Sequence, residues 1–310
     1  MNRKIMLLGK AGQIGGDLCP LLQRLGTVAS FGRAELNLEK PEAIRQAIRA
    51  VQPDVIVNAA AYTAVDKAES EESLARAINA RAPATIAQEA KQTGALLVHY
   101  STDYVFDGAK RSPYLEDDPP NPLGVYGRTK LEGELAIRES GVSHLILRTA
   151  WVYARDGRNF LRTILRLGAE KDELKVVSDQ IGAPTWSHEI AAATLAVLSQ
   201  ILRGSAGTAL RPHHLGTFHV TAAGQASWFD FARAILEEAK GVSQNASWYL
   251  SATSGRPLLA RRLVPISTSE YPVQAARPAY SVLSNARLAE TFGVRLPDWR
   301  ISLQDLFSTE

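Results

Sequence analysis

A tyrosine and a lysine four residues apart, Tyr126 and Lys130, stand at the start of a helix predicted for residues 126–139. This spacing places the phenol and the ammonium group on one face of the helix, one turn apart. A tyrosine normally loses its proton at about pH 10, and a neighbouring cation lowers that pKa. The pair could form an acid/base group that works near neutral pH. The same pair is also common on helix surfaces, so its context must decide.

Hydroxyl and carboxyl groups follow the strand predicted for residues 96–100, where Ser101, Thr102 and Asp103 stand. Open parallel sheets bind ligands beyond the carboxyl ends of their strands. Thr102, Tyr126 and Lys130 would then form the set expected for hydride transfer between a nicotinamide and a carbonyl group. In this reading Tyr126 protonates the carbonyl oxygen and Thr102 holds it. Lys130 lowers the pKa of the phenol and binds the nicotinamide ribose.

A glycine-rich turn near the start of the chain predicts the dinucleotide site. The apolar strand expected at residues 5–8 runs into Gly9, Gly12 and Gly15, and an amphipathic helix follows. Glycines allow a tight turn and bring the backbone close to a pyrophosphate at the helix N-terminus. The spacing G-x-x-G-x-x-G departs from the usual G-x-G-x-x-G. A plain strand–helix turn rarely needs all these glycines, so we expect nucleotide binding.

The end of the second predicted strand, residues 27–31, indicates which cofactor the chain prefers. An NAD site usually has an acidic residue there, which holds the ribose diol. This chain has Gly32 and Arg33, and Glu35 comes two residues later. An arginine at this point could pair with a 2′-phosphate. We therefore expect NADPH, with NADH as the alternative.

Strands and helices alternate about every twenty to thirty residues in the first half of the chain, a rhythm typical of a doubly wound parallel sheet of the Rossmann type. We assign residues 1–150 to a dinucleotide-binding α/β domain, completed by parts of 186–222. Residues 151–310 would form mainly a smaller α/β substrate-binding domain.

Composition limits the class of protein. The chain has 310 residues, a formal net charge of +3 and a single cysteine, Cys19. Such a small charge, without dense runs of Lys or Arg, does not indicate a nucleic-acid partner. No apolar stretch is long enough to span a bilayer, and one cysteine excludes an internal disulfide framework. We expect a soluble, cytoplasmic protein without a membrane partner.

Several longer motifs are more specific than the glycine turn and the Tyr/Lys pair. They are VNAAAYTAVDKAE at 57–69, STDYVF at 101–106, RTAWVY at 148–153, DQIGAPT at 179–185 and ARP at 276–278. With these motifs the chain resembles the extended short-chain dehydrogenase/reductase superfamily and, within it, the dTDP-4-dehydrorhamnose reductase family. The resemblance covers nearly the whole length.

The resemblance implies that a reduced nicotinamide cofactor reduces the C4 ketone of dTDP-4-dehydro-L-rhamnose, a nucleotide sugar. Carried over by position, Thr102, Tyr126 and Lys130 are catalytic. Asp103 and Trp151 would contact the sugar, and Arg277 is our choice for the substrate pyrophosphate. The residues expected to line the cofactor are Gly9, Gly12, Gln13, Ile14, Gly15, Arg33, Asn37, Leu38, Ala59, Ala60, Ala61, Tyr62, Thr63, Tyr126 and Lys130.

Two departures from the family pattern concern the adenosine end and metal binding. Many members have Asp where this chain has Asn37. Some members bind Mg²⁺ through glutamates at a homodimer interface. Here Asp17 stands near one such position, and His188 with Glu189 near the other. The resemblance therefore allows a homodimer with Mg²⁺ at its interface, and no metal is expected in the active site.

Two alternatives share parts of this pattern. One is an epimerase or a reductase that acts on another nucleotide sugar. The other is a non-catalytic regulatory subunit that binds NADP. The intact Thr102, Tyr126 and Lys130 argue against a pure binder, because binding alone needs no proton donor.

Overall fold

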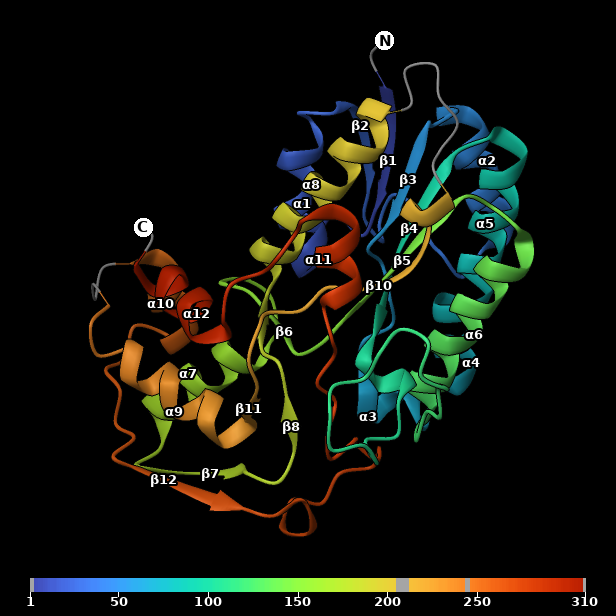
Figure 1. Cartoon of the computed structure of the whole chain (residues 1–310). Coiled ribbons are helices and arrows are strands. Elements are labelled where there is room, and N and C mark those ends of the chain that lie inside the picture. The colour runs from blue at the N-terminus through green and yellow to red at the C-terminus, as the bar shows by residue number, and fades with distance from the viewer. Residues whose placement is uncertain (1–2, 205–211, 243–245, 309–310) are drawn as a thin grey trace.

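A six-stranded sheet forms the centre of the larger lobe (Figure 1). The computed structural model describes residues 3–204, 212–242 and 246–308. The strand order is β10-β5-β4-β3-β1-β2, and every neighbouring pair is parallel. The strands are β1 (Arg3–Leu8), β2 (Gly26–Phe31), β3 (Val55–Asn58), β4 (Leu96–Thr102), β5 (His144–Thr149) and β10 (Gly216–His219).

Helices cover both faces of this sheet, so the predicted doubly wound architecture is confirmed (Figure 1). One face packs against α1 (Gln13–Leu22), α8 (Ser187–Gly204) and α11 (Ala286–Phe292). The other packs against α2 (Pro41–Val51), α5 (Ala82–Thr93) and α6 (Val125–Ser140).

The strands are apolar because both of their faces are buried. In β1, Ile5 and Leu7 pack into the core with α1, whereas Met6 and Leu8 pack into the core with α2. The order of the strands reverses between β1 and β3, because β2 lies on one side of β1 and β3 on the other. Such a reversal opens a crevice at the carboxyl ends of the strands, where ligands bind.

Short helices join the carboxyl end of β3 to α5. These are α3 (Val65–Ala68), α4 (Glu72–Arg76) and a π-helical turn at Ala77–Arg81. Helix α3 has only four residues, too few to show a periodicity in the sequence.

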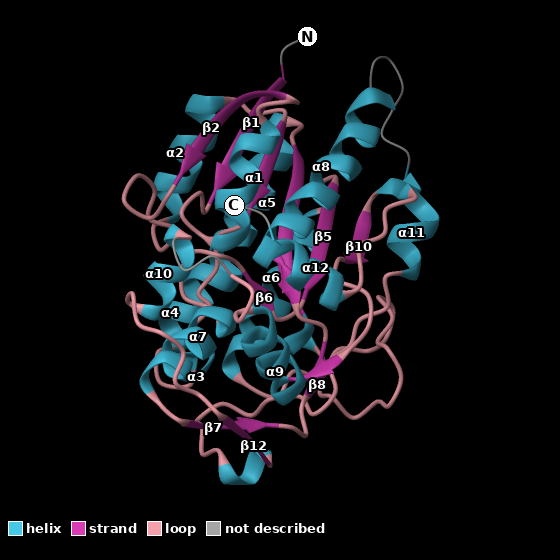
Figure 2. Cartoon of the chain, turned by 90° about the vertical axis from the view of Figure 1, so that its left-hand side faces the viewer, coloured by secondary structure: helices cyan, strands magenta, loops and turns pink. Residues whose placement is uncertain are grey.

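The smaller lobe is built from later parts of the chain (Figure 2). Its helices pack around short paired strands and form a separate core. The helices are α7 (Phe160–Glu170), α9 (Trp228–Glu238), α10 (Ser247–Thr253) and α12 (Trp299–Ser308). The strand pairs are β7 (Glu173–Val177) with β12 (Arg262–Ile266), β8 (Ile181–Gly182) with β11 (Ala226–Ser227), and β6 (Val152–Tyr153) with β9 (Thr185–Trp186).

The chain passes between the two lobes more than once. After β9 it returns to the sheet through α8 and β10, enters the smaller lobe through β11 and α9, and returns again for α11. The division at residue 150 remains our interpretation of the domain organisation. Within the described residues, no helix combines the length and apolar character needed to cross a membrane.

Candidate active site

The glycine turn between β1 and α1 is tightly enclosed by backbone. Gly9 has φ +88°, and its N–H donates to the carbonyl of Phe31 at 2.8 Å. The N–H of Gly12 donates back to the carbonyl of Gly9 at 2.9 Å. A Cβ on Gly15 would lie 2.1 Å from that same carbonyl oxygen. Only glycine at position 15 lets α1 start this close to the turn.

A cavity of about 560 Å³ lies at this turn, over the carboxyl ends of the sheet strands. Almost all residues predicted to bind the cofactor line it; Gly15, which packs behind the turn, does not. Within the described residues, Thr149 Oγ1 is buried at this cavity without a hydrogen-bond partner, and so is Oε1 of Gln13, a residue that also lines a neighbouring cavity. Buried polar atoms normally have partners, so these two fit a polar ligand. The predicted residues along the cavity are Gly9, Gly12, Gln13, Ile14, Arg33, Asn37, Leu38, Ala59, Ala60, Ala61, Tyr62, Thr63, Tyr126 and Lys130.

The end of β2 presents the Arg33 guanidinium to this cavity, whereas the Glu35 carboxylate is bound by other groups. Glu35 accepts hydrogen bonds from Lys10 Nζ at 2.7 Å and from the Gly32 N–H at 2.8 Å, and these partners lower its pKa. Arg33 lines the cavity and Glu35 does not. The Arg33 side chain is 80% exposed and lies 3.4 Å from Glu39. It is therefore accessible to an anionic group of a ligand.

Tyr126 is carried into the cavity by the first turn of α6. Burial raises the pKa of its phenol to about 12, against the lowering effect of the nearby Thr102 hydroxyl. The phenol is therefore protonated at neutral pH. The ring of Tyr104 meets the Tyr126 ring edge-on, with centroids 5.5 Å apart. The structure thus brings Thr102 and Tyr126 together, as the sequence predicted.

Lys130 lies one turn further along α6 and is almost completely buried. Its Nζ donates to the backbone carbonyl of Tyr100 at 2.6 Å and lies 3.3 Å from Nε2 of His99. Burial lowers the pKa of Lys130 to about 8, while Glu134 acts in the opposite direction. Sequence reasoning missed His99. The available signal was a polar residue inside the run 96–100 of β4, whose other residues are Leu, Val and Tyr.

Asp103 follows directly after Thr102 and is also buried. The Thr102 hydroxyl donates to Asp103 Oδ1 at 3.0 Å and accepts from the Tyr104 N–H at 3.1 Å. Burial raises the pKa of Asp103 to about 6. Hydrogen bonds from the Ser281 and Thr102 side chains act in the opposite direction. The carboxylate lies beside Thr102, and its contact with a ligand remains a prediction.

Trp151 and Arg277, predicted to contact the substrate, engage protein partners in this structure. Trp151 has φ +47° and stacks face to face on Trp228, with centroids 3.5 Å apart. A Cβ on Gly182 would lie 2.3 Å from the Trp151 indole, so the ring covers that glycine. Arg277 Nη2 donates to Asp66 Oδ2 at 2.8 Å. Neither residue lines the cofactor-sized cavity, and their roles toward a substrate remain predictions.

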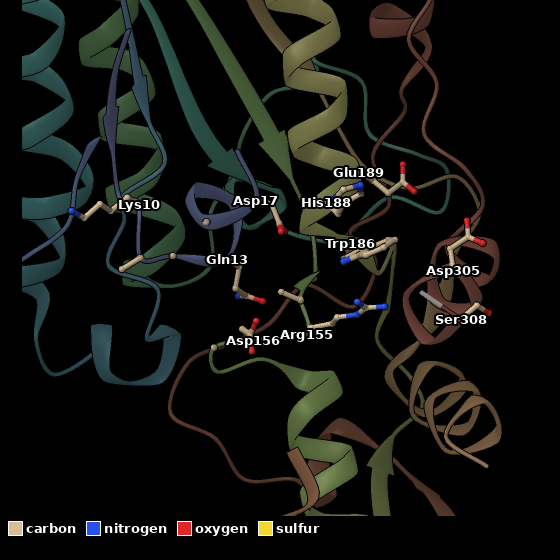
Figure 3. Close-up of a pocket in the computed structure, with 15 residues that line it drawn as sticks. Lys10, Gln13, Asp17, Arg155, Asp156, Trp186, His188, Glu189, Asp305 and Ser308 are labelled. Atoms are coloured by element: carbon tan, nitrogen blue, oxygen red, sulfur yellow. The ribbon is translucent and has the colours of Figure 1, made fainter. Parts of the chain in front are cut away.

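A second cavity, of about 880 Å³, lies on the other side of the glycine turn (Figure 3). Asp17, Glu189 and Asp305 reach it from α1, α8 and α12. Asp17 accepts a hydrogen bond from the Ser187 hydroxyl. In the part of the chain that the structure describes, no group of three or more His, Cys, Asp or Glu is placed to hold a metal ion. The Mg²⁺ site allowed by the resemblance therefore gains no support.

Known proteins are similar to this chain over nearly its whole length. The family model described as RmlD substrate binding domain matches residues 3–310. A dTDP-4-dehydrorhamnose reductase of Burkholderia thailandensis is 48% identical and covers 98% of this chain and 99% of the relative. The enzyme of that name from Escherichia coli K12 is 41% identical and covers 98% of each chain.

Solved structures agree with these sequence relatives. A Bacillus anthracis dTDP-4-dehydrorhamnose reductase in complex with NADP has a TM-score of 0.84 and 32% identity, covering 99% of each chain. A Clostridium acetobutylicum reductase of the same description has a TM-score of 0.85 and 36% identity, covering 98% of each chain. Because the family model and these relatives match from end to end, the chain belongs to the dTDP-4-dehydrorhamnose reductase family.

Proposed function

We propose that the chain reduces the C4 ketone of dTDP-4-dehydro-L-rhamnose to dTDP-L-rhamnose, with hydride from NADPH and a proton from Tyr126. The chain is an NADPH-dependent oxidoreductase whose substrate is a nucleotide sugar. The proposal rests on one observation: Tyr126, Lys130 and the glycine turn line the same cavity. A nicotinamide cofactor and a proton donor would therefore meet at one edge of the sheet.

Each catalytic side chain has a role that follows from its surroundings. The Tyr126 phenol, with its pKa raised to about 12, holds its proton at neutral pH and can give it to a developing alkoxide. The Thr102 hydroxyl, close to that phenol, can hydrogen-bond the same oxygen. Lys130, when protonated, adds a positive charge at the cavity wall, which stabilises the phenolate left behind. The bound cofactor supplies the hydride.

The glycine turn and the end of β2 fit the two ends of a dinucleotide phosphate. The backbone at Gly12 and Gln13 lies at the N-terminus of α1, which favours a pyrophosphate. Arg33 lines the cavity near Asn37 and Leu38, where it can pair with a 2′-phosphate. Glu35 is held by Lys10 and Gly32, so it is not presented to a ribose diol. This arrangement supports NADPH over NADH.

A turnover assay tests the function directly. Purified protein is mixed with NADPH and enzymatically made dTDP-4-dehydro-L-rhamnose, and the nicotinamide absorbance and the product are followed. A reductase consumes NADPH in step with ketone loss. An epimerase would interconvert sugars without net loss of absorbance, and a regulatory subunit would bind NADPH without turnover. Either result would overturn the proposal.

The proton-donor role has a matched pair of variants. Tyr126→Phe removes the phenol hydroxyl and keeps the ring, and we expect kcat to fall by about 10²–10⁴-fold. The affinity for NADPH should stay within about threefold, because the hydroxyl contributes one contact at most. Tyr104→Phe makes the same chemical change on the adjacent ring, 5.5 Å away, and should lower kcat far less. Turnover of Tyr126→Phe like that of the unmodified protein would refute the mechanism.

We also propose a homodimer, which the resemblance allows. Light scattering coupled to size-exclusion chromatography, run with and without Mg²⁺, measures the mass in solution. A monomer under both conditions would contradict this part of the proposal and leave the reductase activity open.

A further inference from the structure

A buried histidine lies directly beneath the lysine of the candidate active site. His99 on β4 and Asn58 on β3 are each 1% exposed, and Lys130 is 2% exposed. Nε2 of His99 is 3.3 Å from Lys130 Nζ, and Nδ1 is 3.1 Å from the Asn58 side-chain nitrogen. These contacts form a short row that runs from the third strand to the catalytic helix. The reaction described above makes no use of Asn58 or His99.

The orientation of the Asn58 amide fixes which imidazole nitrogen carries the proton. Asn58 Oδ1 accepts the N–H of Ala60 at 3.2 Å, so its NH₂ group must point the other way, toward His99. An amide NH₂ can only donate, and Nδ1 of His99 must therefore accept. Burial alone acts to hold the pKa of His99 well below its usual value, and any charge on Lys130 acts in the same direction. The imidazole is therefore neutral, with its single proton on Nε2.

This tautomer affects the charge of Lys130. The Nε2–H points at Lys130 Nζ, and an ammonium group has no lone pair that could accept it. A neutral amine can accept from Nε2–H while it still donates to the Tyr100 carbonyl at 2.6 Å. The row of hydrogen bonds is therefore complete only when Lys130 is neutral. Burial of the nitrogen acts in the same direction.

The other groups around Lys130 do not cancel this effect. Glu134, one turn along α6, favours the ammonium form, but its carboxylate is bound by Arg148 at 2.7 and 2.8 Å and by Arg138 at 2.7 Å. Tyr126 is neutral at the pH of interest.

We propose that His99, oriented by Asn58, is a positioning residue that disfavours the ammonium form of Lys130 in the free protein. A hydroxyl group of the bound cofactor would then accept a hydrogen bond from Lys130 and favour the ammonium form. The inference rests on the proposed function for the meaning of Lys130. The proposal implies that protonation of Lys130 is coupled to cofactor binding. Above about pH 8, where free Lys130 is largely neutral, binding of NADPH takes up protons.

The tautomer can be measured without any activity. Protein labelled with ¹⁵N-histidine and free of cofactor is studied by long-range ¹H–¹⁵N NMR, and His99→Leu identifies the His99 signals. We expect the Nε2–H tautomer in the unmodified protein. A proton on Nδ1, or a charged imidazolium ring at neutral pH, overturns the proposal. Because this readout needs no turnover, its failure is distinct from failure of the reductase proposal.

A reversed hydrogen-bond polarity tests the effect on Lys130. Asn58→Asp keeps an oxygen for Ala60 but presents an acceptor to Nδ1, so the proton moves there and Nε2 can accept from the ammonium group. The titration of Lys130, followed by ¹³Cε-lysine NMR and identified with Lys130→Arg, should move up by more than about one pH unit. In protein that also carries His99→Leu, Asn58→Asp should move the Lys130 titration by less than about half as much. Only the negative charge at position 58 then acts on Lys130.

The outcomes are decisive in both directions. Equal shifts with and without His99 would mean that charge alone acts, and would overturn the proposal. Thr194→Val serves as the control, because it removes a buried hydrogen bond to the Tyr100 hydroxyl, 2.7 Å long, on the same strand. It should leave the Lys130 titration unchanged. If Asn58→Asp does not fold, the tautomer of the unmodified protein still decides.

Discussion

Gly15 gives the sharpest test of the glycine turn. A Cβ at this position would lie 2.1 Å from the Gly9 carbonyl oxygen and 2.7 Å from its carbonyl carbon, whereas ordinary contact begins at 3.4 Å. The turn would have to move by about 1.3 Å to bring the carbonyl oxygen from 2.1 to 3.4 Å. It cannot move freely, because Gly9 is hydrogen-bonded to Phe31 on one side and packs against Ala60 on the other.

The expected loss follows from this displacement. Overpacking of this kind costs about 1–3 kcal/mol of folding free energy. A shifted turn also loses at least one hydrogen bond to a charged phosphate, worth about 1.5–3 kcal/mol. The Kd of Gly15→Ala for NADPH should therefore rise by about 10- to 100-fold. Calorimetric titration with NADPH measures this, and thermal unfolding monitors the fold.

The adjacent glycine is the matched control. A Cβ on Gly16 meets nothing closer than the Lys10 carbonyl oxygen at 3.8 Å, an ordinary contact. Alanine is about 1 kcal/mol better than glycine inside a helix, so Gly16→Ala should bind NADPH normally and unfold at no lower temperature. If Gly15→Ala binds NADPH within about threefold of the unmodified protein, the steric reasoning fails.

Two further predictions concern charge. Arg33→Ala should raise the Kd for NADPH by about tenfold and the Kd for NADH much less, because only NADPH carries the 2′-phosphate. Equal effects on both Kd values would contradict the preference for NADPH. Glu134→Gln leaves the buried Arg148 guanidinium without its full partner and should lower the free energy of unfolding by about 3 kcal/mol in urea titrations. Glu170→Gln breaks an exposed pair with Arg166 and should cost less than about 0.5 kcal/mol; similar losses in both variants would contradict this reading.

The sheet and the cofactor cavity were predictable because their signals are local. Each buried strand is a short apolar run, and each run ends in residues that open parallel sheets place at the ligand edge. Gly9 and Arg33 stand at or just after such ends, Tyr126 stands at the start of the helix that follows the fourth predicted strand, and all three line one cavity in the structure. Element order alone was enough to bring them together.

The partners of side chains could not be predicted, because they join distant parts of the chain. Arg277 pairs with Asp66, 211 residues away in sequence, and Trp151 stacks on Trp228 from α9. Neither contact is indicated by residue spacing or periodicity in the sequence. His99 did leave a trace, a polar residue within an apolar strand, but its meaning depends on an amide that only the folded chain places beside it.

Strand β10 is synthesised long after its partner β5, and this delay affects the nascent chain. Strand β5 ends at Thr149, yet the strand that completes its outer side, β10, begins at Gly216. While the ribosome makes the intervening residues, the edge of β5 has unpaired backbone groups, a template on which other nascent chains can aggregate. Slow codons or chaperone contacts would therefore matter most over this interval of translation. Arrest of synthesis just before residue 216 should give nascent chains that are more prone to aggregation than arrest after residue 308.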